Sequence, residues 1–143
     1  MSEEALENLA RIGQLKLERP APAELEGLVR SARNRLCDAE NPDLSLESQF
    51  DLAYNAAHAL ALASLRWHGY RADSRYLVFQ CLVHTLDLPA EQWRVLDQAH
   101  RKRNLAAYEG EVDIDRGLVE AVIRVAHELE RRVTALGPIQ ERI

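Results

Sequence analysis

The residues best suited to chemistry in this sequence are three adjacent cations, Arg101, Lys102 and Arg103, in a segment that predicts an amphipathic helix over residues 89–110. At 100° per residue, Arg103 falls in the middle of the apolar face of this helix, whereas Arg101 and Lys102 point away from it. A charge on a buried face costs free energy unless it has an ionic partner or lines a cleft. Arg103 is therefore either a structural arginine or a cation held for a ligand. The apolar face is formed by Trp93, Leu96, Ala99 and Ala107.

His100 precedes Arg103 by three residues and lies near the edge of the same face. A guanidinium can stabilise the extra charge that develops on a phosphorus atom under attack, and a histidine can move protons near neutral pH. The plainer interpretation gives Arg103 an acidic partner on a neighbouring helix, or lets its head reach solvent past the helix end. The residues alone leave both interpretations open.

The segment Arg103–Gly110, with the sequence RNLAAYEG, resembles the signature of the HEPN superfamily (higher eukaryotes and prokaryotes nucleotide-binding domain). That signature is an arginine, usually followed by a polar residue such as asparagine, and then a histidine four to six residues further on. Asn104 matches the polar position, and Tyr108 stands where the family has its histidine. The alanine-rich stretch 50–70, which ends in a His-Gly-Tyr turn, is similar to the central helix of the family. The resemblance spans roughly residues 25–129.

In active members of this superfamily, the arginine and histidine of two subunits face one another across a dimer cleft. They cleave RNA without a metal, with the ribose 2′-OH attacking its own phosphate. The resemblance implies Arg103 and Tyr108 as candidate catalytic residues and Asn104 as a candidate binding residue beside them; His100 joins these as a binding candidate because it shares the face of Arg103. Tyrosine has an ordinary pKa near ~10, against ~6.5 for histidine, so it exchanges protons poorly at neutral pH. We therefore expect RNA cleavage to be weak or absent.

The function predicted from this resemblance is that of a dimeric HEPN-like helical protein in a toxin–antitoxin or defence-type module. Its Arg103-centred cleft would hold RNA, a nucleotide or a partner protein. The resemblance also implies a nucleotidyltransferase-type partner protein. Two alternatives stay open: an active, metal-independent endoribonuclease toxin, and a structural adaptor bundle. We expect neither cofactor nor metal, because the sequence has no Gly-rich phosphate loop, no paired-cysteine zinc spacing and no pair of histidines four apart.

The composition predicts one helical-bundle domain over residues 1–143, with the HEPN-like region at about 23–136. Apolar residues make up 47% of the chain and charged residues 29%, as in ordinary soluble proteins. The net charge of -5 argues against a protein that binds nucleic acid with its whole surface, so RNA contact would need a local patch.

An acidic N-terminus and the absence of a long apolar run predict a cytoplasmic protein without a membrane segment. Cys37 and Cys81 are expected to be buried, reduced thiols.

The fold class predicted is all-α, an antiparallel up-and-down bundle of five or six helices without strands. The helix expected to start after Ser45 is apolar nearly all round, which indicates packing on more than one side and favours a homodimer. Breaks at Pro and Gly residues delimit the expected helices. These helices cover residues 3–18, 23–40, 45–68, 74–86, 89–110 and 113–136.

Overall fold

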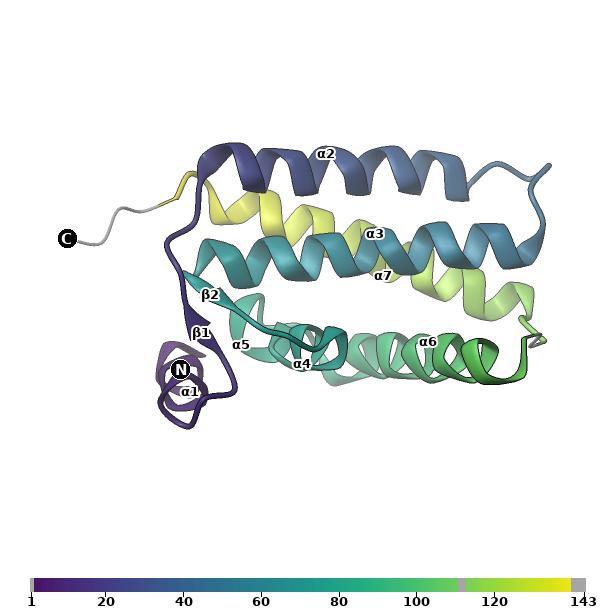
Figure 1. Cartoon of the computed structure of the whole chain (residues 1–143). Coiled ribbons are helices and arrows are strands. Elements are labelled where there is room, and N and C mark those ends of the chain that lie inside the picture. The colour runs from purple at the N-terminus through teal and green to yellow at the C-terminus, as the bar shows by residue number, and fades with distance from the viewer. Residues whose placement is uncertain (1, 111–112, 140–143) are drawn as a thin grey trace.

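The computed structural model describes residues 2–110 and 113–139; the ends of the predicted domain and residues 111–112 lie outside this description. The fold is an all-α helical bundle with one very short sheet, so the predicted fold class is confirmed (Figure 1). The elements are α1 (Ser2–Arg11), β1 (Lys16–Leu17), α2 (Pro22–Ala39), α3 (Leu46–Trp67), β2 (Tyr70–Arg71), α4 (Arg75–Gln80), α5 (Leu82–Thr85), α6 (Ala90–Glu109) and α7 (Arg116–Leu136).

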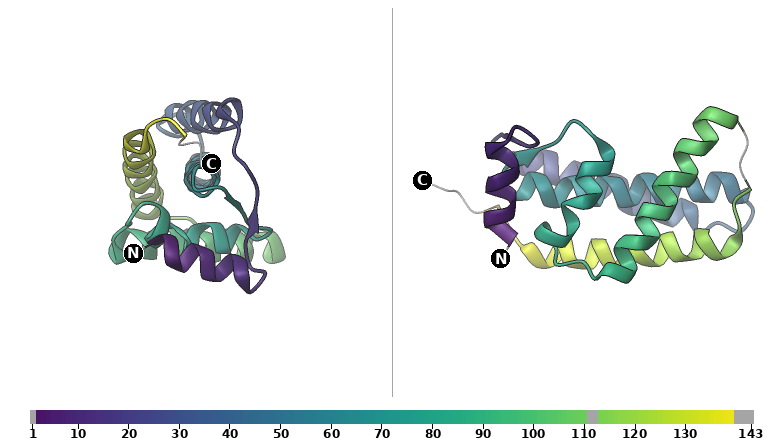
Figure 2. Two further views of the ribbon diagram at one scale, coloured as in Figure 1. Left: turned by 90° about the vertical axis from the view of Figure 1, so that its left-hand side faces the viewer. Right: turned by 90° about the horizontal axis from the view of Figure 1, so that it is seen from below.

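Helix α3 is the centre of the molecule. Seen end-on, it is surrounded by α2, α7 and the layer formed by α4, α5 and α6 (Figure 2). This position explains its composition, because a helix with neighbours on several sides must be apolar on several sides. Small side chains at Ala53, Ala57 and Ala61, all fully buried, let neighbouring backbones approach closely. The prediction that this helix packs on more than one side is confirmed, and one chain provides all of these neighbours.

Side-chain caps fix where the principal helices begin. Ser45 accepts a hydrogen bond from the backbone N–H of Ser48 at the start of α3, and Asp115 does the same for Leu118 at the start of α7. Helix α6 begins directly after Pro89 and ends at Gly110, whose positive φ of 77° suits a glycine. Residues 90–109 are thereby held as one continuous helix that carries the predicted site.

Two predicted elements differ from the structure. The first helix ends at Arg11 instead of continuing to residue 18, because the chain turns at Gly13, with φ of 83°, and sends Leu15 back into the core. Residues 16–17 then pair with residues 70–71 as antiparallel strands, so the expectation of no strand is wrong.

The helix expected over 74–86 is divided at Cys81 into α4 and α5. Cys81 is buried as expected, whereas Cys37 is exposed.

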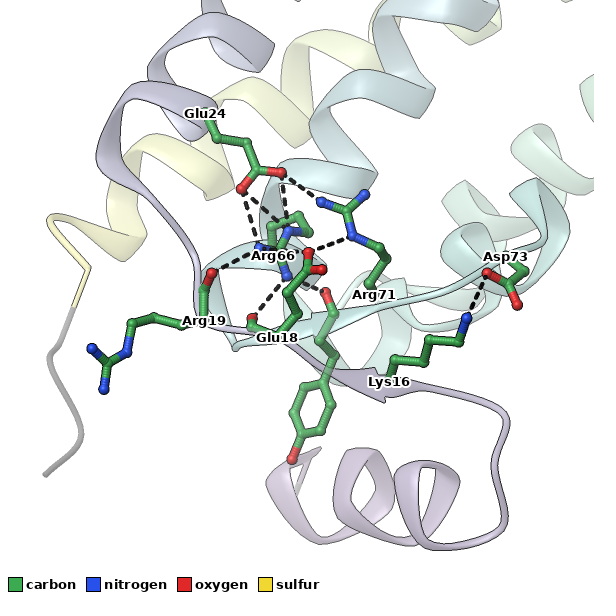
Figure 3. Close-up of polar contacts among 8 residues, drawn as sticks. Lys16, Glu18, Arg19, Glu24, Arg66, Arg71 and Asp73 are labelled. Atoms are coloured by element: carbon green, nitrogen blue, oxygen red, sulfur yellow. Dashed lines mark hydrogen bonds and ion pairs between the residues drawn. The ribbon is translucent and has the colours of Figure 1, made fainter.

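The N-terminal segment is tied to the bundle by a buried arginine near the end of α3. Arg66 is only 1% exposed, and it donates hydrogen bonds to the carbonyl oxygens of Glu18, Arg19 and Tyr70 (Figure 3). Its guanidinium also forms an ion pair with Glu24 of α2, with 3.1 Å between Nε and Oε2. These contacts satisfy the donors of a charge that would otherwise be stranded in the core. We call these five residues the Arg66 latch.

Within the described residues, none of the helices has the length and apolar character needed to cross a membrane.

Candidate functional site

The second half of α6 lies against the middle of α3 and against α4, and it is here that polar side chains gather. We call this group the Tyr54 cluster. Helix α3 contributes a tyrosine and a histidine, α4 an arginine and a phenylalanine, and α6 three of the predicted site residues. Its members are Tyr54, His58, Arg75, Phe79, His100, Arg103 and Asn104.

Tyr54 and His100 form the buried base of the cluster. Tyr54 is 0% exposed, and its hydroxyl lies 2.9 Å from Nδ1 of His100. The other ring nitrogen of His100, Nε2, lies 3.1 Å from the amide nitrogen of Asn104, one helical turn further along α6. An amide nitrogen can only donate, so Nε2 accepts this hydrogen bond. His100 is therefore the neutral tautomer that carries its proton on Nδ1 and donates it to the Tyr54 hydroxyl.

Two guanidiniums converge on the same tyrosine. The central carbon of Arg103 lies 4.9 Å from the ring centroid of Tyr54, and that of Arg75 lies 6.0 Å from it. Arg75 also donates to the side-chain oxygen of Asn55 at 3.1 Å. Across the described ranges, neither arginine forms an ion pair with a carboxylate, in contrast to Arg66. Arg103, half-buried on the inner side of α6, is thus held by an aromatic ring instead of an acid.

Asp97, the acid that acts on His100, is already engaged by other partners. Asp97 accepts a hydrogen bond from the hydroxyl of Tyr76 at 3.0 Å, and its second oxygen lies 3.3 Å from Nε of Arg101. Arg101 is exposed and lies outside the inner face of the helix, as the sequence predicts. The exposed Arg101 and the half-buried Arg103 therefore have different surroundings although they are two residues apart.

The electrostatics of the cluster favour uncharged histidines. Burial lowers the pKa of His58 to about 4, and the positive charges of Arg75 and Arg103 act in the same direction. Burial also lowers the pKa of His100, as does Arg103, against a smaller opposing effect of Asp97. For Tyr54, burial raises the pKa while the two arginines oppose this change. At neutral pH the cluster therefore holds two cations, two neutral imidazoles and a protonated tyrosine.

The structure brings together three of the four predicted site residues, namely His100, Arg103 and Asn104. Tyr108 does not join them: it is 91% exposed, on the turn of α6 that follows Asn104. In the described part of the chain, no hydrogen bond to its hydroxyl is present. Two turns of helix, about 12 Å, separate it from His100 along the helix axis.

The site residues that come from α3 and α4 were not identified from the sequence. Tyr54, His58 and Arg75 are far from α6 in the chain, and no spacing rule links them to it. His58 packs edge-on against Phe79, with 5.7 Å between ring centroids, and no hydrogen bond to it occurs among the described residues. One feature of the α3 sequence could have indicated this part of the site: Tyr54 and His58 are four residues apart and so share one side of the helix.

This arrangement can bind an anion. Two guanidiniums without acidic partners supply charge and planar donors, and the imidazole of His100 supplies a group that can take up a proton. No set of three His, Cys, Asp or Glu side chains in the described residues is placed to hold a metal ion.

Comparison of the chain with protein-family models, with curated proteins and with solved structures finds no match.

Proposed function

We propose that this chain is a HEPN-like helical protein of a toxin–antitoxin or defence-type module, and that its Tyr54 cluster binds the phosphate of an RNA segment or a nucleotide. The observation that carries the proposal is the pair of guanidiniums, from Arg75 and Arg103, beside one tyrosine ring and without ion-pair partners in the described residues. Guanidinium groups match phosphate oxygens in shape and charge. Because no carboxylate is paired with these two guanidiniums, a phosphate does not have to displace one.

The overall charge of the chain makes this local arrangement significant. With a net charge of -5, the protein as a whole repels polyanions, so any affinity for phosphate must come from a restricted positive region. The Tyr54 cluster is such a region, since its two arginines have no ion-pair partner in the described residues, while Asp97 is hydrogen-bonded to Tyr76 and paired with Arg101. A structural adaptor would need no such uncompensated pair of cations.

The proposed binding function does not require catalysis. The family signature would place its proton-transferring residue at Tyr108, which is exposed and separate from the cluster. Weak or absent cleavage of RNA is therefore expected. A homodimer and a nucleotidyltransferase-type partner protein belong to the same proposal, and both rest on the resemblance instead of on a contact within this chain.

One observation favours a second candidate, an active metal-independent ribonuclease. His100 is a neutral imidazole at physiological pH, and it lies in the same cluster as Arg103. A neutral imidazole beside a guanidinium is a suitable general base for attack of a 2′-OH on its phosphate. Robust RNA cleavage that survives chelation and disappears in Arg103→Ala would favour this candidate over a binding protein.

The proposal is tested by fluorescence anisotropy with a labelled single-stranded RNA and the full-length protein at low salt. Binding should weaken as salt rises, because phosphate contacts release counterions. Arg75→Ala should weaken binding about tenfold, which corresponds to one lost charged hydrogen bond of about 1.4 kcal/mol. Arg94→Ala is the matched control, since Arg94 is an exposed arginine of α6 about two and a half turns before Arg103, on the opposite side of the helix. Equal effects of both variants, or no binding, would contradict the proposal. Competition with a mononucleotide separates a nucleotide site from an RNA site.

A further inference from the structure

The hydrogen bonds of His100 leave one position open to a proton. In the neutral ring, Nδ1 donates to Tyr54 and Nε2 accepts from Asn104. Asn104 is exposed, whereas Tyr54 is fully buried, so the basic nitrogen is the one that faces solvent. A proton taken up on Nε2 would turn this nitrogen into a donor. Asn104 can then rotate its amide so that its oxygen, in place of its nitrogen, faces the ring.

Burial is the main reason why the His100 ring is neutral without a ligand, and the charged groups around it add to this effect. Helix α3 presents Tyr54 and His58 to it, and α4 presents Arg75 together with Tyr76, whose ring centroid lies 5.1 Å from that of His100. On its own helix, Arg103 repels a positive imidazole more strongly than Asp97, which is paired with Arg101, attracts one. Cations therefore outweigh free acids around the ring.

An anion bound to the arginines would reverse this balance. A phosphate dianion neutralises Arg75 and Arg103 and adds negative charge beside the imidazole, so the charged ring gains stability. We propose that binding of a phosphate-bearing ligand to Arg75 and Arg103 is coupled to uptake of one proton from solvent on Nε2 of His100. The Asn104 amide then rotates so that its oxygen accepts a hydrogen bond from the new Nε2–H. This inference rests on the proposed function and adds its regulation: the site binds anions more tightly at lower pH.

Coupling between the two binding events is reciprocal. If the anion favours the protonated ring, then protonation favours the anion by the same factor. One linked proton raises the affinity by at most about tenfold for each pH unit. The effect should also be larger for a dianionic terminal phosphate than for a singly charged phosphodiester, because the dianion offsets more of the local positive charge.

The test uses sulfate as the probe, because sulfate keeps its double charge between pH 6 and 8 whereas phosphate itself titrates. Histidine resonances of the full-length protein are followed by NMR through this range, with sodium sulfate or with sodium chloride at equal ionic strength. We expect the titration midpoint of His100 to rise in sulfate, while that of His127, on α7 beside Glu40, stays unchanged. Isothermal titration should show sulfate affinity rising several-fold from pH 8 to pH 6.

His100→Gln separates binding from coupling, because glutamine retains hydrogen-bonding capacity but does not titrate. The sulfate affinity of this variant should be the same at pH 6 as at pH 8, whereas that of the unmodified protein should rise. Sulfate binding of equal strength at all pH values in the unmodified protein would overturn the coupling and leave the proposed function standing. An equal shift of His100 and His127 would overturn it as well. If sulfate does not bind at any pH, the proposed function fails, and the coupling fails with it.

Discussion

Two arginines on inner helix faces have opposite surroundings at the scale of single residues. Arg66 is fully buried, and its donors are taken up by Glu24 and by backbone carbonyls of the N-terminal segment and of β2. Arg103 is half-buried, and its guanidinium contacts the ring of Tyr54. The first pattern is that of a charge used to hold the fold, and the second is that of a charge available to a ligand.

Truncating Arg66 should therefore be costly. Arg66→Ala leaves the carboxylate of Glu24 without its main partner and the carbonyls of Glu18 and Arg19 without donors, so the free energy of unfolding should fall by roughly 3–5 kcal/mol. Urea unfolding followed by circular dichroism measures this loss. Arg124→Ala, on an exposed position of α7, serves as the control. A loss below about 1 kcal/mol would show that the latch contributes little to stability.

Asn104 offers a second residue-level test, independent of any ligand. Asn104→Asp replaces the amide beside Nε2 of His100 with a carboxylate, which accepts a hydrogen bond from the protonated ring and attracts its charge. The pKa of His100 should rise by about 1 or more in NMR titrations without sulfate. An unchanged midpoint would show that the contact between the two side chains does not persist in solution.

Single residues also show how much of the candidate site could be predicted from the sequence. Helical periodicity placed Arg103 on the inner face and Arg101 outside it, and both positions agree with the structure. The partner of Arg103 could not be predicted, because Tyr54 belongs to another helix and a tyrosine in an alanine-rich apolar stretch reads as core. Tyr108 entered the predicted site through family resemblance alone, and the structure leaves it exposed.

At the scale of elements, the order of the principal helices was predictable because glycine, proline and capping residues mark their ends. The short strands and the turn at Gly13 were not predictable. A strand of two residues is too short for an alternating pattern to be visible, and the pairing of residues 16–17 with 70–71 depends on contacts made only in the folded chain. The turn at Gly13 was missed because the apolar spacing that leads to Leu15 also fits a longer helix.

The central position of α3 yields a prediction about its alanines. Ala57 is fully buried, with α3 enclosed by other helices. Ala57→Leu should force neighbouring helices apart and lower the free energy of unfolding by about 1–3 kcal/mol. The change is measured by chemical unfolding, with Ala135→Leu on an exposed position of α7 as the control. Unchanged stability would mean that the helices around α3 are more loosely packed than the structure indicates.

At the scale of the whole molecule, stability should depend on pH through His58. Its pKa is about 4 in the folded protein, against an ordinary value of 6.5. Because the folded value is the lower one, the stabilising contribution of neutral His58 is complete above pH 6.5 and is lost as the pH falls toward 4. Glu24, whose pKa its hydrogen bond with Arg66 lowers, adds a further loss below about pH 4.5.

Urea midpoints measured between pH 7 and 5, in buffers without sulfate or phosphate, should therefore fall with pH. His58→Gln should flatten this dependence. Parallel curves for the unmodified protein and His58→Gln would contradict the assignment to His58.

Assembly is the second whole-molecule question. The apolar character of α3, taken from the sequence as a reason for dimerisation, is accounted for by neighbours within one chain. Dimerisation stays a prediction, and the exposed Leu105 and Tyr108 of α6 are the apolar side chains nearest to the cluster that could support it. Light scattering should give about twice the 16.2 kDa mass of the chain, and Leu105→Glu should reduce it. A monomer at micromolar concentration would remove the shared cleft from the account.

The most direct test of the central claim measures Arg103→Ala in two ways on the same preparation, by unfolding and by RNA binding. Removal of Arg103 strands no acidic partner in the described residues, so the free energy of unfolding should change by less than about 1 kcal/mol. Affinity for single-stranded RNA should fall about tenfold or more, while Arg94→Ala should bind as the unmodified protein does. A loss of several kcal/mol in stability with unchanged RNA affinity would show that Arg103 holds the fold and would contradict the account.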